Sequence, residues 1–191
     1  MLAYLVGSIP SGLLIGKLFY HKDIRQFGSK NIGATNAYRV LGLKAALAVF
    51  LCDAAKGAIG AWLFSFDQNL MLLGGILAMA GHNWPIFLRF KGGRGVATGL
   101  GVLIFLTPAV SAICFALWAV IVYFTKFVSL GSIVAAAFVP ILMILFGEPL
   151  SYVIFGTVAA LFVIFRHREN IGRLLAGKEL KVERTKQEDR K

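Results

Sequence analysis

A polar, glycine-bearing stretch, GSKNIGATN, covers residues 28–36, and Arg39 follows it. Glycine lets the backbone turn so that several amide N–H groups point at one anion. Side-chain donors are available at Ser29, Asn31, Thr35 and Asn36. If a helix begins near Asn36, its first amides also favour an anion, and Arg39 lies about one turn inside it. The stretch predicts an anion-binding loop; the alternative is a turn between two helices with Asn36 as N-cap.

A second segment of this kind, KGGRG, covers residues 91–95 and leads into an apolar run that begins at Val96. Three glycines and two cations before a helix start are the ingredients of a phosphate nest. The spacing of a nucleotide-binding Walker A loop is missing. The segment therefore predicts a phosphate-binding loop of another kind, with a flexible basic turn as the alternative.

A third segment, RHREN, covers residues 166–170, where the last apolar run ends. His167 can accept a proton or donate to a substrate oxygen near neutral pH. Asn170 follows about one helical turn later, so both side chains would lie on one helix face. The alternative is a basic segment at a membrane exit whose Arg and Glu side chains pair in water.

The composition indicates that these three segments connect helices of a membrane protein. Of the 191 residues, 58% are hydrophobic and only 15% are charged, and the mean hydropathy is +0.77. Soluble domains are roughly 45–50% apolar. The formal net charge is +11, and the basic residues lie between apolar runs rather than along one polar face. This distribution indicates membrane topology and contact with anionic lipid headgroups, and it argues against a nucleic-acid partner.

The apolar runs cover residues 2–20, 43–66, 70–88, 96–125, 128–146 and 150–165. A membrane-spanning helix needs about 20 residues, so 96–125 is too long for one upright span. Thr107-Pro108 lies inside it. The run is either one long tilted helix or two short ones.

Charge favours two helices, because Lys and Arg in short loops mark the cytoplasmic side. With seven spans, all basic segments fall on one side and Asp67 and Glu148 on the other. We therefore predict an all-α, polytopic integral membrane bundle of seven transmembrane helices, with the N-terminus outside and the C-terminus cytoplasmic. Residues 1–172 form a single catalytic domain in this prediction, and 173–191 form a charged cytoplasmic tail.

Two ionisable residues, Asp53 and Lys56, lie inside an apolar run. Such residues are costly in a membrane unless they are paired, and the i,i+3 spacing allows mutual neutralisation. We expect them to support the structure or to orient a cationic site. The sequence has no spacing typical of metal ligands, so no cofactor is expected.

Taken together, GSKNIGATN, DAAKG, GHNWP with KGGRGVATG, and RHRENI resemble the bacterial acyl-phosphate:glycerol-3-phosphate acyltransferases, in the same order over nearly the whole chain. The resemblance implies a catalytic set of Ser29, Arg39, Lys91, His167 and Asn170. It implies substrate contacts at Asn31, Gly33, Ala34, Thr35, Asn36, Gly92, Gly93, Arg94, Gly95 and Ser129. Arg94 departs from the Lys expected in that family's glycine loop, and Glu169 looks structural.

The implied reaction moves a fatty acyl group from acyl phosphate to the 1-hydroxyl of glycerol 3-phosphate and gives lysophosphatidic acid and phosphate. The resemblance also implies a multi-pass enzyme of the bacterial inner membrane with its active site facing the cytoplasm. Acyl phosphate is already activated, so positioning the two substrates, which can lower a barrier by about 7–11 kcal/mol, needs no protein nucleophile. The base is either His167 or the substrate's own phosphate.

Other function classes fit less well. None of His21, His82 and His167 has the Asp five positions later that a thioester-using H-x4-D acyltransferase needs. No G-x-S-x-G elbow is present for a covalent serine mechanism. A transporter for an organic phosphate should have a polar path across the membrane, whereas here the polar motifs gather at one face. The sequence does not determine the oligomeric state.

Overall fold

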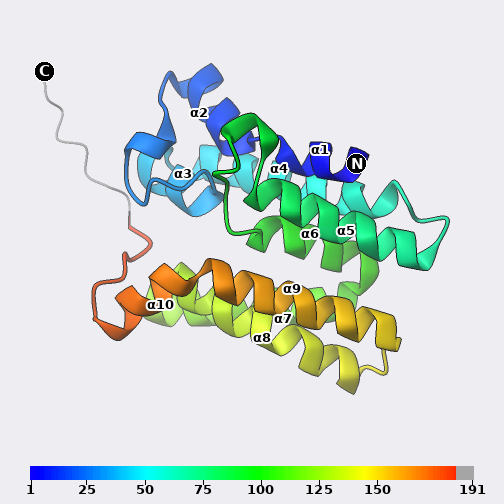
Figure 1. The fold of residues 1–191 in the computed structure, drawn as a ribbon. Helices are drawn as coiled ribbons and strands as arrows, with labels where there is room; N and C mark the ends of the chain where they lie inside the picture. Colours follow the sequence, from blue (N-terminus) through cyan, green and yellow to red (C-terminus); the bar gives the residue numbers. More distant parts are fainter. Residues whose placement is uncertain (184–191) are drawn as a thin grey trace, which may run out of the picture.

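The computed structural model describes residues 1–183, which form ten α-helices and two short 3-10 helices (Figure 1). The elements are α1 (Leu2–Ser8), α2 (Ser11–Tyr20), η1 (Ile24–Gln26), α3 (Ala34–Leu41), α4 (Leu43–Trp62), α5 (Gln68–Asn83), η2 (Ile86–Leu88), α6 (Val96–Leu106), α7 (Pro108–Thr125), α8 (Val128–Leu145), α9 (Leu150–Arg166) and α10 (Arg168–Leu175). Each apolar run of the sequence coincides with one of these helices or with two consecutive ones. The prediction of an all-α fold is confirmed.

The long run 96–125 consists of two helices, α6 and α7. Thr107 separates them with φ −142° and ψ 75°, and Pro108 is the first residue of α7. Proline has no N–H and clashes with the carbonyl four residues earlier, so it is favoured in the first helical turn and disfavoured further inside a helix. A second break at Ile9 and Pro10 bends α1 and α2 by 42° relative to each other.

Figure 1 shows two layers of helices, with α1 to α6 in one and α7 to α9 in the other. Helices α4 and α6 approach most closely where both have glycine. A Cβ atom at Gly101 would lie only 1.8 Å from the Ala54 carbonyl oxygen, and one at Gly57 only 2.0 Å from that of Thr98. The backbones therefore pack directly, as is common between helices in membranes.

The buried charges of α4 strengthen this layer. Lys56 Nζ lies 2.8 Å from Asp53 Oδ1 and donates to the Ile9 carbonyl, 3.0 Å away, at the α1–α2 break. The mutual neutralisation expected from the i,i+3 spacing is confirmed. The pair also fixes a carbonyl group that the break leaves outside the helix.

The outer surface of the bundle is strongly apolar, because exposed Leu, Ile, Val and Phe side chains cover α4 to α9. Four helical segments are long and apolar enough to cross a membrane: α4, Gln68–Leu88, α7 and α8. The number is six when the bent pairs α1–α2 and α9–α10 each count as one span. Helix α6 is apolar but has only 11 residues.

All the basic connections lie at one end of the bundle (Figure 1). The connections α2–α3, α5–α6 and α7–α8 and the segment after α9 are on the left of the view, whereas α4–α5, α6–α7 and α8–α9 are on the right. The three polar segments of the sequence therefore converge although more than 120 residues separate the first from the last.

Candidate active site

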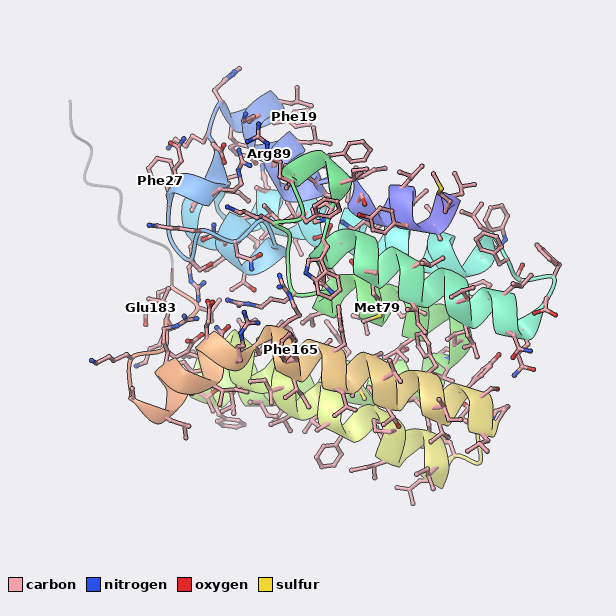
Figure 2. All side chains as sticks on the ribbon, in the orientation of Figure 1. Phe19, Phe27, Met79, Arg89, Phe165 and Glu183 are labelled. Atoms are coloured by element: carbon pink, nitrogen blue, oxygen red, sulfur yellow. The ribbon has the colours of Figure 1, made fainter. Side chains whose placement is uncertain are left out.

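A pocket of about 490 Å³ extends between the two layers from the end that carries the basic connections. Its polar mouth is formed by residues of all three sequence segments, including Ser29, Arg39, Arg94 and His167. Its deeper walls are apolar side chains of α4, α6, α7, α8 and α9, and Met79, a pocket-lining residue of α5, lies between the layers in Figure 2. The pocket thus combines a cationic head with a long apolar body.

The first loop is organised by Asn36, which is 1% exposed. Its side-chain amide donates to the carbonyls of Ile24, Phe27 and Asn31, and its Oδ1 accepts from the Ser29 N–H at 2.8 Å. One buried amide therefore fixes the turn that presents Ser29. Gly33, not Asn36, is the N-cap of the following helix α3.

Helix α3 directs its N-terminus and Arg39 at the pocket. The backbone N–H groups of Ala34 and Thr35 donate no hydrogen bond to the described residues, whereas Asn36 and Ala37 both donate to the Gly33 carbonyl. The two free amides and the nearby Thr35 hydroxyl can bind an anion. Arg39 is 8% exposed and forms no ion pair with a carboxylate of residues 1–183.

The glycine loop 91–95 is held from both sides. Gly92 and Gly93 donate their N–H groups to the carbonyls of Asn83 and His82 at the end of α5. Arg166 of α9 donates to the Gly93 carbonyl at 2.8 Å. His82 and Asn83 therefore hold the loop through their backbone carbonyls, whereas His82 Nδ1 and the Asn83 side-chain amide form no hydrogen bond within the described residues.

The loop ends at Gly95, whose left-handed backbone (φ 79°) starts helix α6. The first amides of α6 have no side-chain cap, so they are available to a phosphate group. Arg94 lines the same pocket. Burial lowers the pKa of Arg94 to about 10, and the side chain therefore stays cationic at neutral pH.

His167 lies between α9 and α10, just beyond the apolar run, and is 2% exposed. Its Nδ1 is 2.8 Å from the Val163 carbonyl oxygen. Because a carbonyl only accepts, Nδ1 carries the hydrogen, and Nε2 is left as a free acceptor in a residue that lines the pocket. Burial, with nearby Arg94 and Arg166, lowers the pKa of His167 to about 4. The imidazole is therefore neutral at pH 7.

Glu179 was not singled out by the sequence, yet it connects several predicted site residues. Its carboxylate accepts from Ser129 Oγ at 2.9 Å, from Asn170 Nδ2, and from Arg173 Nε at 2.8 Å. Glu169, for which the family resemblance suggested a structural role, is exposed, and that role stays a prediction. A carboxylate in a charged tail has no local pattern that reveals such contacts, because Ser129 is 50 residues away.

The segment after α10 also crosses the pocket mouth. Arg39 donates to the carbonyls of Leu180 and Lys181 at 2.9–3.2 Å, and the Val182 N–H donates to the Lys126 carbonyl at 2.8 Å. Residues 179–182 therefore form a strap across one flank of the pocket.

The structure does not bring all predicted residues to this pocket. Its lining includes Ser29, Asn31, Gly33, Ala34, Thr35, Asn36, Arg39, Arg94, Gly95 and His167. Ser129 and Asn170 are buried behind it, where both donate to Glu179. Lys91 and Gly92 line an adjoining outer pocket, and Gly93 is buried against the His82 ring.

The pocket therefore has cations and free amides at its mouth and apolar side chains in its body. A family model described as "Glycerol-3-phosphate acyltransferase" matches residues 1–177. The chain belongs to the glycerol-3-phosphate acyltransferase family. Among its relatives, the glycerol-3-phosphate acyltransferase of Syntrophomonas wolfei is 45% identical over 95% of this chain and 94% of its own. Glycerol-3-phosphate acyltransferase 2 of Moorella thermoacetica is 47% identical over 95% of each.

Two solved structures of PlsY (YgiH), an integral membrane glycerol 3-phosphate acyltransferase, share the fold of this acyltransferase. The glycerol 3-phosphate form has a TM-score of 0.88 at 38% identity and covers 94% of this chain and 92% of its own. The lysophosphatidic acid form has a TM-score of 0.86 at 39% identity and covers 94% and 91%. The predicted family, the enzyme class and the integral membrane character are confirmed.

We expect Glu179→Gln to lower the stability of this acyltransferase by about 2 kcal/mol, a decrease in Tm of roughly 4–8 °C, because charged hydrogen bonds are lost. Burial alone would raise the pKa of Glu179, but hydrogen bonds from Asn170, Ser129 and Arg173 outweigh it and lower the pKa. A carboxyl group whose pKa is depressed in the folded protein contributes stability above its unfolded pKa of about 4.3. That contribution is lost as the pH falls through the folded pKa. The Tm difference should thus be constant from pH 8 to about pH 5.

The matched control for this prediction is Glu169→Gln, which removes the same charge from an exposed position that forms no ion pair within residues 1–183. Thermal unfolding of the purified protein in a nonionic detergent measures both variants. An equal decrease in Tm for the two would contradict the role given to Glu179.

Proposed function

We propose that this chain is a seven-span enzyme of the bacterial inner membrane that transfers a fatty acyl group from acyl phosphate to the 1-hydroxyl of glycerol 3-phosphate. The products are lysophosphatidic acid and phosphate. One observation carries the proposal: two groups of free amides, Arg39 and Arg94 share one mouth of a pocket whose body is apolar. Two phosphorylated reactants, one with a lipid tail, match this combination of surfaces.

We assign the acyl phosphate to the glycine loop and the apolar body. The amides at the start of α6 and Arg94 would bind its phosphate, and the acyl chain would lie among side chains such as Phe50, Val139 and Phe155. Apolar burial contributes about 25 cal/mol per Å² to holding the chain. This placement puts the carbonyl carbon at the boundary between the polar mouth and the apolar body.

We assign glycerol 3-phosphate to the first loop. Arg39, the free amides of Ala34 and Thr35, and Ser29 would bind its phosphate, while Asn170 and Lys91 support the site from beside it. The 1-hydroxyl is then directed at His167. The other predicted contacts of this loop, Asn31, Gly33 and Asn36, shape the turn or line its wall.

In the proposed reaction the 1-hydroxyl oxygen attacks the acyl carbonyl carbon directly. His167 Nε2 takes the hydroxyl proton, a C–O ester bond forms, and the bond between the acyl carbon and the phosphate oxygen breaks. The leaving phosphate and the transient oxyanion are stabilised by Arg94 and the α6 amides, and well-placed donors of this kind contribute about 3–4 kcal/mol. No protein nucleophile takes part.

The proposed topology rests on charge. The basic connections lie at one end of the bundle and Asp67 and Glu148 lie at the other, which by the positive-inside rule puts the active site in the cytoplasm. Helix α6 is then the short seventh span. Neighbours cover it, since Thr98, Gly101, Val102 and Leu103 are all buried.

We keep 1–172 as the catalytic domain and 173–191 as its charged tail, of which residues 184–191 lie outside the described part. The contacts of Glu179 and the strap support a tail that begins at the site itself.

Cysteine labelling of Lys91→Cys and Arg168→Cys in sealed vesicles tests the topology. Labelling of the two positions from opposite sides would overturn it.

The deciding experiment is purified protein supplied with acyl phosphate and glycerol 3-phosphate. Formation of lysophosphatidic acid and phosphate in equal amounts supports the proposal. The other candidate, transport of an organic phosphate, would give counterflow in liposomes without product. The free polar groups of the described residues gather at one end, which favours the enzyme.

Arg39→Ala should raise the KM for glycerol 3-phosphate about 10- to 100-fold, because a charged hydrogen bond contributes roughly 1.5–3 kcal/mol. Arg39→Lys keeps the charge but loses the planar fork, so it should fall between wild type and Ala. Steady-state kinetics at saturating acyl phosphate measure the effect. Lys44→Ala, which removes an exposed cation outside both pockets, is the control. An unchanged KM in Arg39→Ala would contradict the assignment.

A further inference from the structure

A second pocket, of about 720 Å³, adjoins the active site at the same end of the bundle. It lies between the loops 25–32 and 87–94 and the segment 166–169. Ser29, Asn31 and Arg94 line both this outer pocket and the inner one. The two hollows therefore meet at residues proposed to bind substrate.

The outer pocket has a strong excess of positive charge. Two of its cations are already engaged, since Arg25 pairs with Asp23 and Arg166 binds carbonyls of the glycine loop. Five more line it without an ion pair to a carboxylate of residues 1–183: Lys30, Arg89, Lys91, Arg94 and Arg168. Among residues 1–183, Glu169 is the one acidic side chain in its lining.

These cations come from three separate connections, so their meeting at one hollow is a property of the fold. Basic loops at a cytoplasmic face explain the presence of Lys and Arg, but they do not require the side chains to surround a common space. Figure 2 shows Arg89 at the end of the bundle where nitrogen-bearing side chains gather. A hollow lined by one sign of charge concentrates ions of the opposite sign.

The rest of the pocket mouth offers a small polar substrate little access. The strap 179–182 crosses one flank, where Arg39 binds Leu180 and Lys181, and Val182 lines the inner pocket. The remaining walls are apolar side chains between helices, and moving a charged phosphate past them is costly. Of the two pockets lined by the described residues, the outer one gives a polar approach to the site.

We propose that the outer pocket is a capture site for the phosphate dianion of a small water-soluble substrate, which it passes to the inner site. The amphipathic acyl donor enters separately, from the membrane. This inference rests on the proposed function, with glycerol 3-phosphate as the captured molecule. Lys30 and Arg89 attract the dianion and take no part in the chemistry.

The test compares Lys30→Gln/Arg89→Gln with the matched control Lys17→Gln/Lys44→Gln, which removes the same charge from exposed residues outside both pockets. All proteins are assayed in nonionic detergent at saturating acyl phosphate while the salt concentration is varied. At about 10 mM salt, where charges act over roughly 30 Å, kcat/KM for glycerol 3-phosphate should fall about 10-fold in the outer-pocket variant. Its kcat should be unchanged.

The difference should shrink to less than about twofold near 1 M salt, where the Debye length is about 3 Å, and the control should follow wild type throughout. An equal fall in the control, a fall in kcat, or an effect that salt does not reduce would overturn the capture site. Absence of product from the wild-type protein would instead overturn the proposed function, so the two failures are distinct.

Discussion

Replacing His167 with alanine should lower kcat by about 10²- to 10⁴-fold, the usual contribution of general base catalysis, with little change in the KM for glycerol 3-phosphate. The expected loss of kcat follows from the tautomer of His167. Nδ1 donates to the Val163 carbonyl, and Nε2 is therefore the acceptor in a residue that lines the pocket. Steady-state kinetics with both substrates varied give the two constants separately.

The low pKa of His167 shapes this prediction. Burial and the nearby cations Arg94 and Arg166 hold the pKa at about 4, so the imidazole is neutral but weakly basic before substrate binds. A bound phosphate neutralises these cations and makes Nε2 a better proton acceptor. The alternative base is the phosphate of the substrate itself. Turnover that survives in His167→Ala with a raised KM would favour that route and contradict ours.

Replacing Gly92 with alanine should lower kcat/KM about 100-fold. A Cβ atom there would lie 2.2 Å from the His82 carbonyl oxygen and 2.4 Å from Pro85 Cδ. These atoms belong to the end of α5 and the turn after it, which cannot move as a flexible side chain does. The glycine loop must shift instead, and a displacement of about 1 Å at a catalytic group costs roughly 10²-fold in rate.

The control for the loop variant is Gly172→Ala in α10, where a Cβ atom would have no neighbour within 4 Å. Its activity should match wild type, and its stability should be equal or higher, since alanine suits a helix better than glycine. Thermal unfolding separates a displaced loop from an unfolded protein. A Gly92→Ala enzyme with normal kcat/KM would show that the loop tolerates displacement and does not hold a reacting group.

Both experiments test residues that the sequence indicated, because glycine loops and a histidine beside an apolar run have local signatures. The helices were predictable for the same reason. An apolar run longer than a turn must satisfy its backbone hydrogen bonds within a helix when lipid surrounds it, and Pro108 favours the start of a new helix. The convergence of the three segments was also predictable, because alternating spans return basic loops to one side.

The tertiary structure alone decided what each residue touches. Asn36 uses its whole amide to fix the first loop, although its type is equally suited to binding a substrate. Glu179 reaches Ser129 across 50 residues from a tail whose composition indicates only solvation. The seven cations of the outer pocket come from three connections. Local sterics and hydropathy determine helices and turns, whereas such contacts depend on how distant segments pack, and no periodicity in the chain encodes that packing.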